Sequence, residues 1–185
     1  MRYQSMIFRA APRRCQGFTL IEMLMVVVVL GILLGIAATR LDWQRYRADA
    51  VSRGVLAELA QAQRLAVSLQ LDVRVTATDG VLQIHEDADN DGTVDSGERV
   101  RRVPLEHGYR FGRGSAATLP APADGSELTT LAFRRDGSAS RAGAVYIAPP
   151  VADAPGRYAR AVTIARGTGR AVWYTHGTGS WQRRT

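Results

Sequence analysis

The chain has 185 residues, which is enough for one medium-sized domain and an additional segment. Its formal net charge is +7, every basic residue is an arginine, and four of the arginines precede residue 18, so the rest of the chain is only mildly basic. The single cysteine, Cys15, excludes an intrachain disulfide framework, and no histidine or second thiol near it in sequence suggests a metal or catalytic role.

Residues 18–39 form an apolar segment behind this basic stretch. The segment has 22 residues, about the length that a helix needs to cross a bilayer core, and its only charged residue is Glu22. The arginines before it and the polar chain after it favour a cytoplasmic N-terminus and a C-terminus outside the membrane. A secretory signal peptide has a shorter apolar run, and a plain membrane anchor leaves Glu22 unexplained. The segment therefore predicts a transmembrane helix in which Glu22 has a further role.

The residues from Gly17 to Glu22 read G-FTLIE. This motif resembles the processing signal of type IV pilins and type II secretion pseudopilins. The resemblance implies that residues 1–17 are a leader, that a prepilin peptidase cuts between Gly17 and Phe18, and that Phe18 is then N-methylated. A translation start at Met1 gives a leader of 17 residues and a start at Met6 gives a shorter one, and the sequence allows both.

Cleavage would place a positive ammonium group on Phe18, about one helical turn from Glu22. An ionisable group in lipid is costly and usually has a partner. In a helical stack of such subunits that partner would be the N-terminal amine of a neighbour, and an unpaired buried charge costs more than a paired one. The sequence therefore predicts an assembly role for Glu22, with extension of its carboxylate to the headgroup region as the alternative.

The region 40–71 predicts a continuation of this helix. It contains no proline, and its apolar residues recur at steps of three and four, which is typical of one buried helix face. The members of this stripe are Val51, Val55, Leu59, Ala62, Ala66 and Leu69. We expect one long helix from Phe18 to Leu71, with an amphipathic second part that packs on a head domain.

Residues 72–185 predict a β-rich head, because short strand-like runs alternate with turn signals such as Asp79-Gly80 and Asp136-Gly137. The expected strands cover residues 73–78, 81–86, 98–105, 129–135, 144–149, 159–166 and 170–176. Residues 112–127, rich in glycine, alanine, serine and proline, predict a surface loop. The expected fold class is α+β: a long N-terminal helix, transmembrane in its first half, packed on an antiparallel sheet of about six to eight strands, which is the pilin-like fold.

The segment from Val162 to His176 reads VTIARGTGRAVWYTH. With its Gly169-Arg170 pair it resembles the closing hairpin of the H-type minor pseudopilin and FimT family. The resemblance implies a minor pseudopilin of a type II secretion system in the bacterial inner membrane, with a periplasmic head. Its implied partners are other major and minor pseudopilins, the prepilin peptidase and the inner-membrane secretion platform. The alternative is a FimT-like minor pilin of a type IV pilus that binds DNA for uptake.

An acidic run from Asp87 to Glu98 matches the spacing of a calcium-binding loop, D-x-D-x-D-G-x5-E. The ligands expected from this spacing are Asp87, Asp89, Asp91, Thr93, Asp95 and Glu98. The flanks predict strands and not the paired helices of an EF-hand, and aspartate and glycine also suit a hairpin turn without an ion. Calcium is therefore the one cofactor that the sequence suggests. The alternative is a hairpin turn that binds no metal.

The last third of the chain is basic, with nine arginines against two acids in residues 134–184. Arg166, Arg170, Arg183 and Arg184 lie near tryptophans and a tyrosine, a combination that can hold phosphates and stack on bases. A solvated basic face with Trp173 in the core explains the same pattern. His85, His107 and His176 are widely separated and no nucleophile or phosphate-binding motif occurs, so we predict no enzymatic activity.

Overall fold

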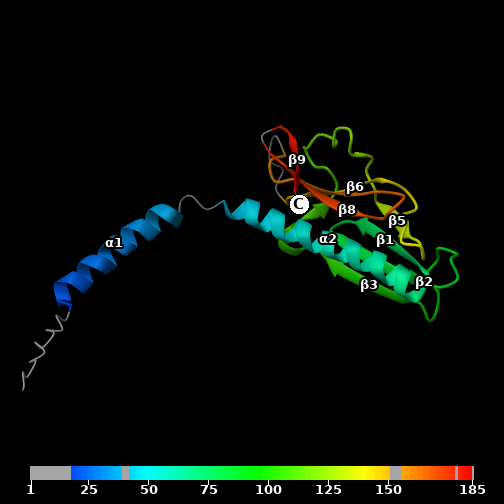
Figure 1. Cartoon of the computed structure of the whole chain (residues 1–185), viewed down its shortest axis with the longest axis horizontal. Helices are drawn as coiled ribbons and strands as arrows, with labels where there is room; N and C mark the ends of the chain where they lie inside the picture. The colour runs from blue at the N-terminus through cyan, green and yellow to red at the C-terminus, as the bar shows by residue number, and fades with distance from the viewer. Residues whose placement is uncertain (1–17, 39–41, 151–155, 178, 185) are drawn as a thin grey trace, which may run out of the picture. The chain divides into compact units, whose positions relative to one another are not determined.

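The computed structural model describes residues 18–38, 42–150, 156–177 and 179–184. The chain divides into two units, Met1–Leu41 and Asp42–Thr185. The first unit contains helix α1 (Leu20–Ala38), and the second contains helix α2 (Trp43–Leu69), the short helix η1 (Glu106–Gly108) and the strands β1 to β9 (Figure 1).

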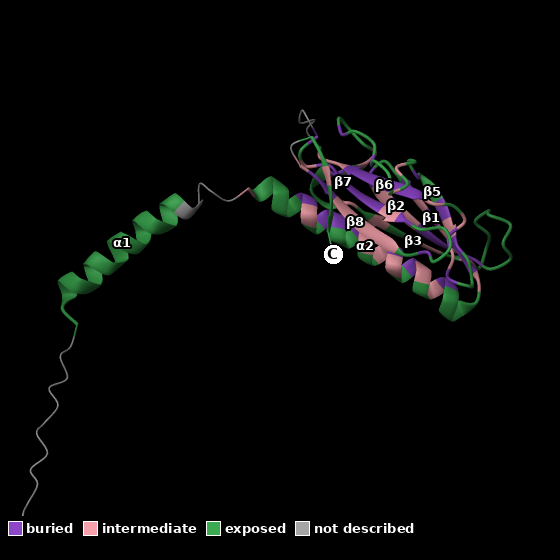
Figure 2. Ribbon diagram, turned by 45° about the horizontal axis from the view of Figure 1, so that its top comes forward, coloured by how far each residue is buried: buried purple, intermediate pink, exposed green. Residues whose placement is uncertain are grey.

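α1 is apolar on every side. Its only acidic residue is Glu22, in the first turn, and its side chains from Leu20 to Ile36 are all exposed (Figure 2). A helix that is apolar all round is normally covered by protein or by lipid, and the described residues of this unit do not cover it. Among the helices formed by the described residues, none has both the length and the apolarity needed to cross a membrane.

α2 has an N-terminal cap of its own. Asp42 has a non-helical backbone (φ −83°, ψ 81°), and its side chain accepts a hydrogen bond of 3.1 Å from the Arg45 amide, which satisfies one of the free donors of the first turn. The helix ends where Gln70 adopts the left-handed conformation. The single helix that we predicted over 18–71 is therefore wrong, since the structure has two helices there, and residues 39–41 lie outside the described residues.

The predicted amphipathic stripe of α2 is confirmed except at its end. Its buried residues are Ala48, Val51, Ser52, Val55, Leu59, Ala62 and Ala66. Leu69 is 49% exposed because it is the last residue of the helix. The stripe packs against strands of both sheets, so α2 is the central element of the head.

Two antiparallel sheets form the rest of the head. The first has the order β3-β2-β1-β5 and the second has the order β4-β6-β7-β8-β9. The strands of the first sheet are β1 (Asp72–Thr78), β2 (Val81–Asp87), β3 (Arg99–Pro104) and β5 (Thr130–Phe133). Those of the second are β4 (Arg110–Phe111), β6 (Gly143–Ala148), β7 (Arg160–Ile164), β8 (Ala171–His176) and β9 (Trp181–Arg184).

The seven predicted strands are all present, with ends shifted by at most two residues. Two further strands have no clear signal in the sequence: β4 has only two residues, and β9, with the sequence WQRR, is too short and too polar to show alternation. The fold class is confirmed: the head is α+β, with one helix packed on antiparallel sheets.

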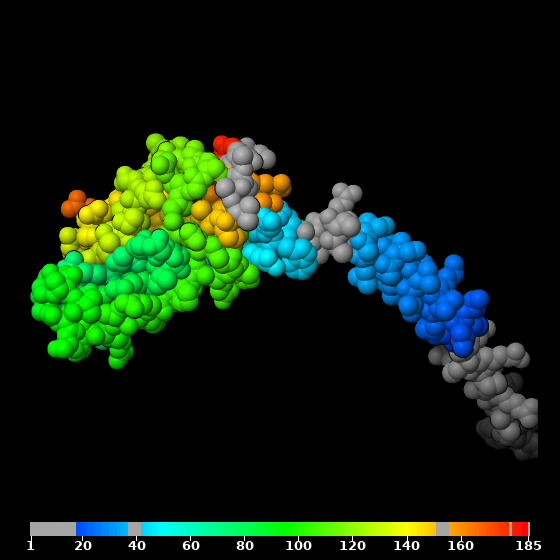
Figure 3. Space-filling view, turned by 180° about the vertical axis from the view of Figure 1, so that it is seen from behind, coloured from blue at the N-terminus to red at the C-terminus, as the bar shows by residue number. Residues whose placement is uncertain are grey.

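The main core lies between α2 and the two sheets and contains Leu59, Val73, Phe133, Ile147 and Ile164. A second, smaller cluster contains Leu119, Ala144, Tyr146 and Ala161. The surface loop predicted over residues 112–127 supplies part of this cluster. The Leu119 amide donates to the Tyr146 hydroxyl (3.0 Å), which donates to the Gly125 carbonyl (2.7 Å). This segment, yellow-green in Figure 3, is therefore attached to the head by packing and hydrogen bonds.

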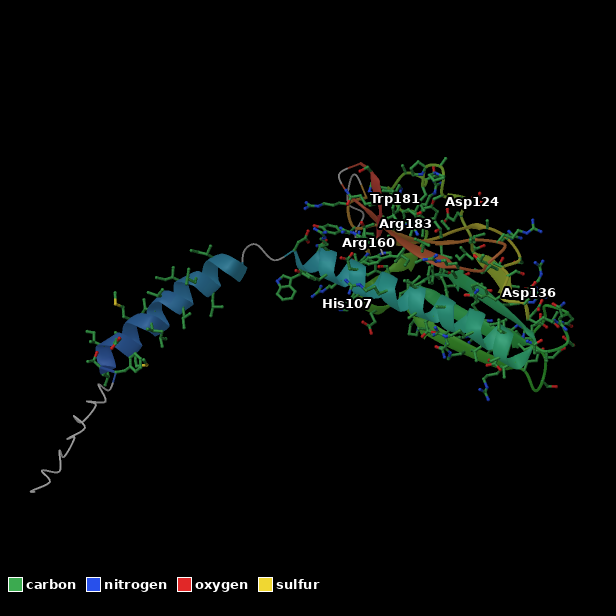
Figure 4. All side chains as sticks on the ribbon, viewed as in Figure 1. His107, Asp124, Asp136, Arg160, Trp181 and Arg183 are labelled. Atoms are coloured by element: carbon green, nitrogen blue, oxygen red, sulfur yellow. The ribbon has the colours of Figure 1, made fainter. Side chains whose placement is uncertain are left out.

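A buried ion pair connects α2 with β7. Arg160 Nε donates to Asp49 Oδ1 at 2.7 Å, and the side chains are 2% and 16% exposed. Arg160 Nη1 also donates to the Ala159 carbonyl at 2.8 Å. Figure 4 labels Arg160 near the N-terminal part of α2. Removal of one partner from a buried ion pair leaves an uncompensated charge and strongly destabilises the fold.

Candidate functional site

The N-terminal end of α1 has a defined local structure. The Glu22 amide donates to the Thr19 side-chain oxygen (3.3 Å) and to the Thr19 carbonyl (3.1 Å). Thr19 and Glu22 thus have the T-x-x-E spacing of a capping box, which is a second signal in the sequence beside the processing motif. Glu22 also lies where the helix dipole favours a negative charge. The cap uses the Glu22 amide, whereas the predicted assembly role uses its carboxylate, so a test has to distinguish the two.

Phe18 precedes this cap and is 75% exposed, and Gly17 lies outside the described residues. The next two apolar side chains, Leu20 and Ile21, are 86% and 73% exposed. The segment predicted to be processed therefore presents an accessible aromatic residue, a carboxylate and an apolar helix to its surroundings.

The acidic loop joins β2 to β3. The structure brings three of the six predicted ligands together, since one carboxylate oxygen each of Asp87, Asp89 and Asp91 lie within 4.8 Å of one another. Thr93 binds Asp91 through its amide (2.6 Å) and its hydroxyl (2.8 Å), and these hydrogen bonds lower the pKa of Asp91. Asp95 is exposed, and its pKa is raised chiefly by the negative charge of Asp91.

Glu98, predicted as the last ligand, instead closes the loop. Its Oε2 lies 2.6 Å from His85 Nε2 and accepts from the Asp95 amide at 3.1 Å, and its Oε1 accepts from the Ala88 amide at 2.8 Å. These hydrogen bonds lower the pKa of Glu98 to about 2, and the bond with His85 has the largest effect. The sequence assigned no role to His85. It lies on β2, is 4% exposed, and fixes Glu98.

This arrangement predicts a pH dependence that Glu98→Gln should reduce. The folded-state pKa of Glu98, about 2, is below the ordinary value of about 4.3 in an unfolded chain. The ionised group therefore adds stability above pH ~4.3, and that stability is lost as the pH falls toward 2. We expect the melting temperature of the wild type to fall more steeply over this range than that of Glu98→Gln. Thermal melts at several pH values test this, with the exposed Glu106→Gln as the control. Equal slopes in all three proteins would contradict the assignment.

The four arginines of the predicted nucleic-acid site do not share one surface. Arg166 and Arg170 line a cavity of about 410 Å³ together with Tyr174. Arg183 is opposite Tyr174 in the β8–β9 register, whereas the next residue, Arg184, is opposite Trp173. Because neighbouring residues of a strand point to opposite faces, Arg183 and Arg184 lie on different sides of the sheet.

The tryptophans near these arginines pack against the head. Trp181 has its ring 4.8 Å from the His176 ring, and its Nε1 donates to the Ala117 carbonyl at 2.9 Å. Arg53 of α2 lies over Trp173, 5.3 Å from the ring centroid. Both residues thus have structural contacts, which supports the alternative of a solvated basic face.

The turn that contains Gly169 and Arg170 is attached to α2. Gln63 Nε2 donates to the Gly137 carbonyl (2.8 Å) and to the Thr168 carbonyl (2.7 Å), so one side chain joins two turns. Gly169 has φ +61°, and a Cβ atom there would lie 2.2 Å from the Gly137 oxygen. Glycine is required at this position by both backbone conformation and space.

We therefore expect Gly169→Ala to destabilise the head by about 3 kcal/mol, from left-handed strain and overpacking together. Gly167→Ala is the matched control, because it lies two residues away with no atom near the added Cβ. Thermal unfolding should show a fall of several degrees for Gly169→Ala and a small change for Gly167→Ala. Equal melting temperatures would show that the turn is not packed in this way.

The two parts of the chain match two families of known proteins. Residues 12–38 match the prokaryotic N-terminal methylation motif. An apolar helix with this motif and an α+β head define the class of pilin-like proteins. Residues 51–181 match the family of type II transport protein GspH, and the chain belongs to this family.

Comparison with individual proteins adds a distant likeness. The structure of the minor pseudopilin EpsH from the type 2 secretion system of Vibrio cholerae aligns with a TM-score of 0.44 and 14% sequence identity. The alignment covers 75% of this chain and 97% of EpsH. No curated protein sequence matches the chain.

Proposed function

We propose that this chain is a minor pseudopilin of a type II secretion system, processed at Gly17–Phe18 by a prepilin peptidase and methylated on Phe18. The observation that carries the proposal is the presence of both signatures on one chain, the methylation motif over 12–38 and the GspH family over 51–181. A methylation motif alone is shared by many filament subunits, and the family of the head makes type II transport the best-supported system.

In this proposal α1 provides the assembly surface. Its exposed apolar side chains require cover, and the helices of neighbouring major and minor pseudopilins provide it in the filament. Before assembly the segment 18–39 lies in the inner membrane, with the basic N-terminus in the cytoplasm and the head in the periplasm, as the arginines of the leader favour. The inner-membrane secretion platform would then add the subunit to the growing pseudopilus.

The head would make contacts with other subunits and with cargo through its surface, without catalysis. The buried Arg160–Asp49 pair and the attachment of two turns by Gln63 support a rigid shape for it. A rigid subunit can transmit a push from the filament to a folded exoprotein, and this is the step that we assign to the assembled pseudopilus.

Deletion of the gene tests the proposal. We expect secreted proteins to accumulate in the periplasm of the deletion strain, and expression of the wild-type chain to restore their export. A DNA-uptake assay and a gel-shift titration with the head at several salt concentrations serve as the second arm. The proposal would be contradicted if the deletion strain kept secretion but lost DNA uptake, and if the head bound DNA in a salt-dependent way that an Arg166/Arg170 double variant removed. These results would favour a DNA-binding minor pilin.

A further inference from the structure

The acidic loop between β2 and β3 contains a cluster of carboxylates beyond what its turn requires. Asp87 ends β2, and its register partner Asp72 begins β1, directly after α2. The loop therefore extends from the end of the head at which α2 ends, as Figures 1 and 2 also show. Within the described part of the chain, Asp87, Asp89 and Asp91 are the one group of three or more potential metal ligands whose oxygens converge.

The turn geometry of Asp91 does not by itself indicate an ion. Asp136 accepts hydrogen bonds from the Ser138 amide (2.9 Å) and hydroxyl (2.6 Å), in the same way that Asp91 binds Thr93. Asp124 likewise accepts from the Ser126 amide at 2.9 Å. Among the described residues, no group of converging carboxylates accompanies these two turns. What distinguishes the loop is the convergence of the three side chains, and this needs a separate explanation.

Asp87 provides an independent observation. Its side chain is fully buried, and its Oδ1 has no hydrogen-bond partner, while its Oδ2 accepts from Arg74 Nε. An unpaired buried carboxylate oxygen is costly, and native proteins normally satisfy such a group. Asp87 belongs to the converging group, so a cation that binds among the three side chains and reaches Oδ1 would be the partner that this oxygen lacks.

Arg74 is the one cation of the chain seen in contact with the cluster among the described side chains. Its Nη2 also donates to Asn90 Oδ1 at 3.2 Å, and its guanidinium lies 3.0 Å from where a Cβ of Gly92 would be. One guanidinium does not balance three carboxylates. The negative charge that remains also affects Asp95, whose pKa is raised by Asp91 first and by Asp89 and Glu98 as well.

We propose that Asp87, Asp89 and Asp91 bind a calcium ion. Calcium takes carboxylate oxygens at about 2.3–2.6 Å, so two oxygens on one ion lie at most about 5 Å apart. The observed limit of 4.8 Å fits this span without movement of the backbone. Backbone carbonyls of the loop and water complete the coordination. Glu98 is not a ligand here, because His85 and two amides already hold it.

Calcium titration of the full chain in detergent, after treatment with a chelator, tests the site. We expect saturable heat for one ion per chain with a midpoint of about 0.1–1 mM, in the range of weak extracellular sites, and a rise in melting temperature. Asp89→Asn/Asp91→Asn should lose both effects. Asp136→Asn, which changes the matching turn that lacks the cluster, should retain both.

The absence of heat and of a melting shift in the wild type would overturn the proposal, and so would calcium binding that persists in the double variant. Magnesium binding as tight as that of calcium would overturn the choice of ion, because magnesium requires shorter, octahedral coordination. The wild-type titration decides the question even if the double variant does not fold. Each outcome leaves the proposed secretion function unchanged, because the site does not rest on it.

Discussion

Replacement of Glu22 by glutamine should reduce co-purification of partner pseudopilins with this subunit by at least ten-fold. The substitution retains the side-chain length and a T-x-x-Q spacing, so the hydrogen bond from the amide of residue 22 to Thr19 is preserved. It removes only the negative charge. Loss of a partner for a buried charge costs about 3–5 kcal/mol, and 1.4 kcal/mol already corresponds to a ten-fold change in an equilibrium constant.

Two controls separate charge from helix capping in this experiment. Thr19→Ala removes the hydrogen bond to the Glu22 amide and retains the carboxylate, so it should assemble nearly as well as the wild type. Glu22→Ala should behave like Glu22→Gln. Cross-linking and pull-down from membranes measure assembly, and the amount of processed subunit in the membrane fraction should be equal in all four proteins. Normal assembly of Glu22→Gln with poor assembly of Thr19→Ala would mean that the cap, and not the charge, matters.

The second large effect is expected in the head. Asp49→Asn should lower the free energy of unfolding by about 3 kcal/mol, because it leaves the guanidinium of Arg160, 2% exposed, without its anionic partner. Urea unfolding of the full chain in detergent, followed by tryptophan fluorescence, measures this loss. The control is Glu127→Gln, which breaks a pair of 3.3 Å with Arg113 whose side chains are 38% and 42% exposed. A surface pair of this kind contributes about 1 kcal/mol or less.

A double variant tests whether the loss comes from the unpaired charge. Asp49→Leu/Arg160→Met removes both charges and fills the space with apolar atoms, and such replacements are often neutral. We expect it to be more stable than Asp49→Asn alone. If Asp49→Asn and Glu127→Gln have similarly small effects, then the pair between α2 and β7 is not a stabilising connection of the head.

The sequence predicted those parts of the fold that depend on local pattern. The stripe from Val51 to Ala66 has helical spacing, and the strands of the head lie between turn residues that are close in sequence. Asp42 shows where a local pattern misleads. Its ability to cap a helix is visible in the sequence, but the absence of proline and the apolar stripe that follows predicted a continuous helix instead.

Contacts between distant parts of the chain could not be predicted in this way. Asp49 and Arg160 are 111 residues apart, and Gln63 reaches Thr168 across 105, so no local pattern could pair them. In the acidic loop the spacing correctly grouped Asp87, Asp89 and Asp91. It could not show that His85, on the preceding strand, would hold Glu98. Side chains with several potential partners are assigned by the tertiary fold and not by spacing alone.

The central claim is that this subunit enters a filament through a processed, methylated N-terminus next to Glu22. Intact-mass and N-terminal peptide mass spectrometry of the subunit purified from membranes test this claim most directly. The account predicts a mature chain that begins at Phe18 and carries one methyl group on its α-amine. A membrane form that still begins at methionine, or that begins at any residue other than a methylated Phe18, would contradict it.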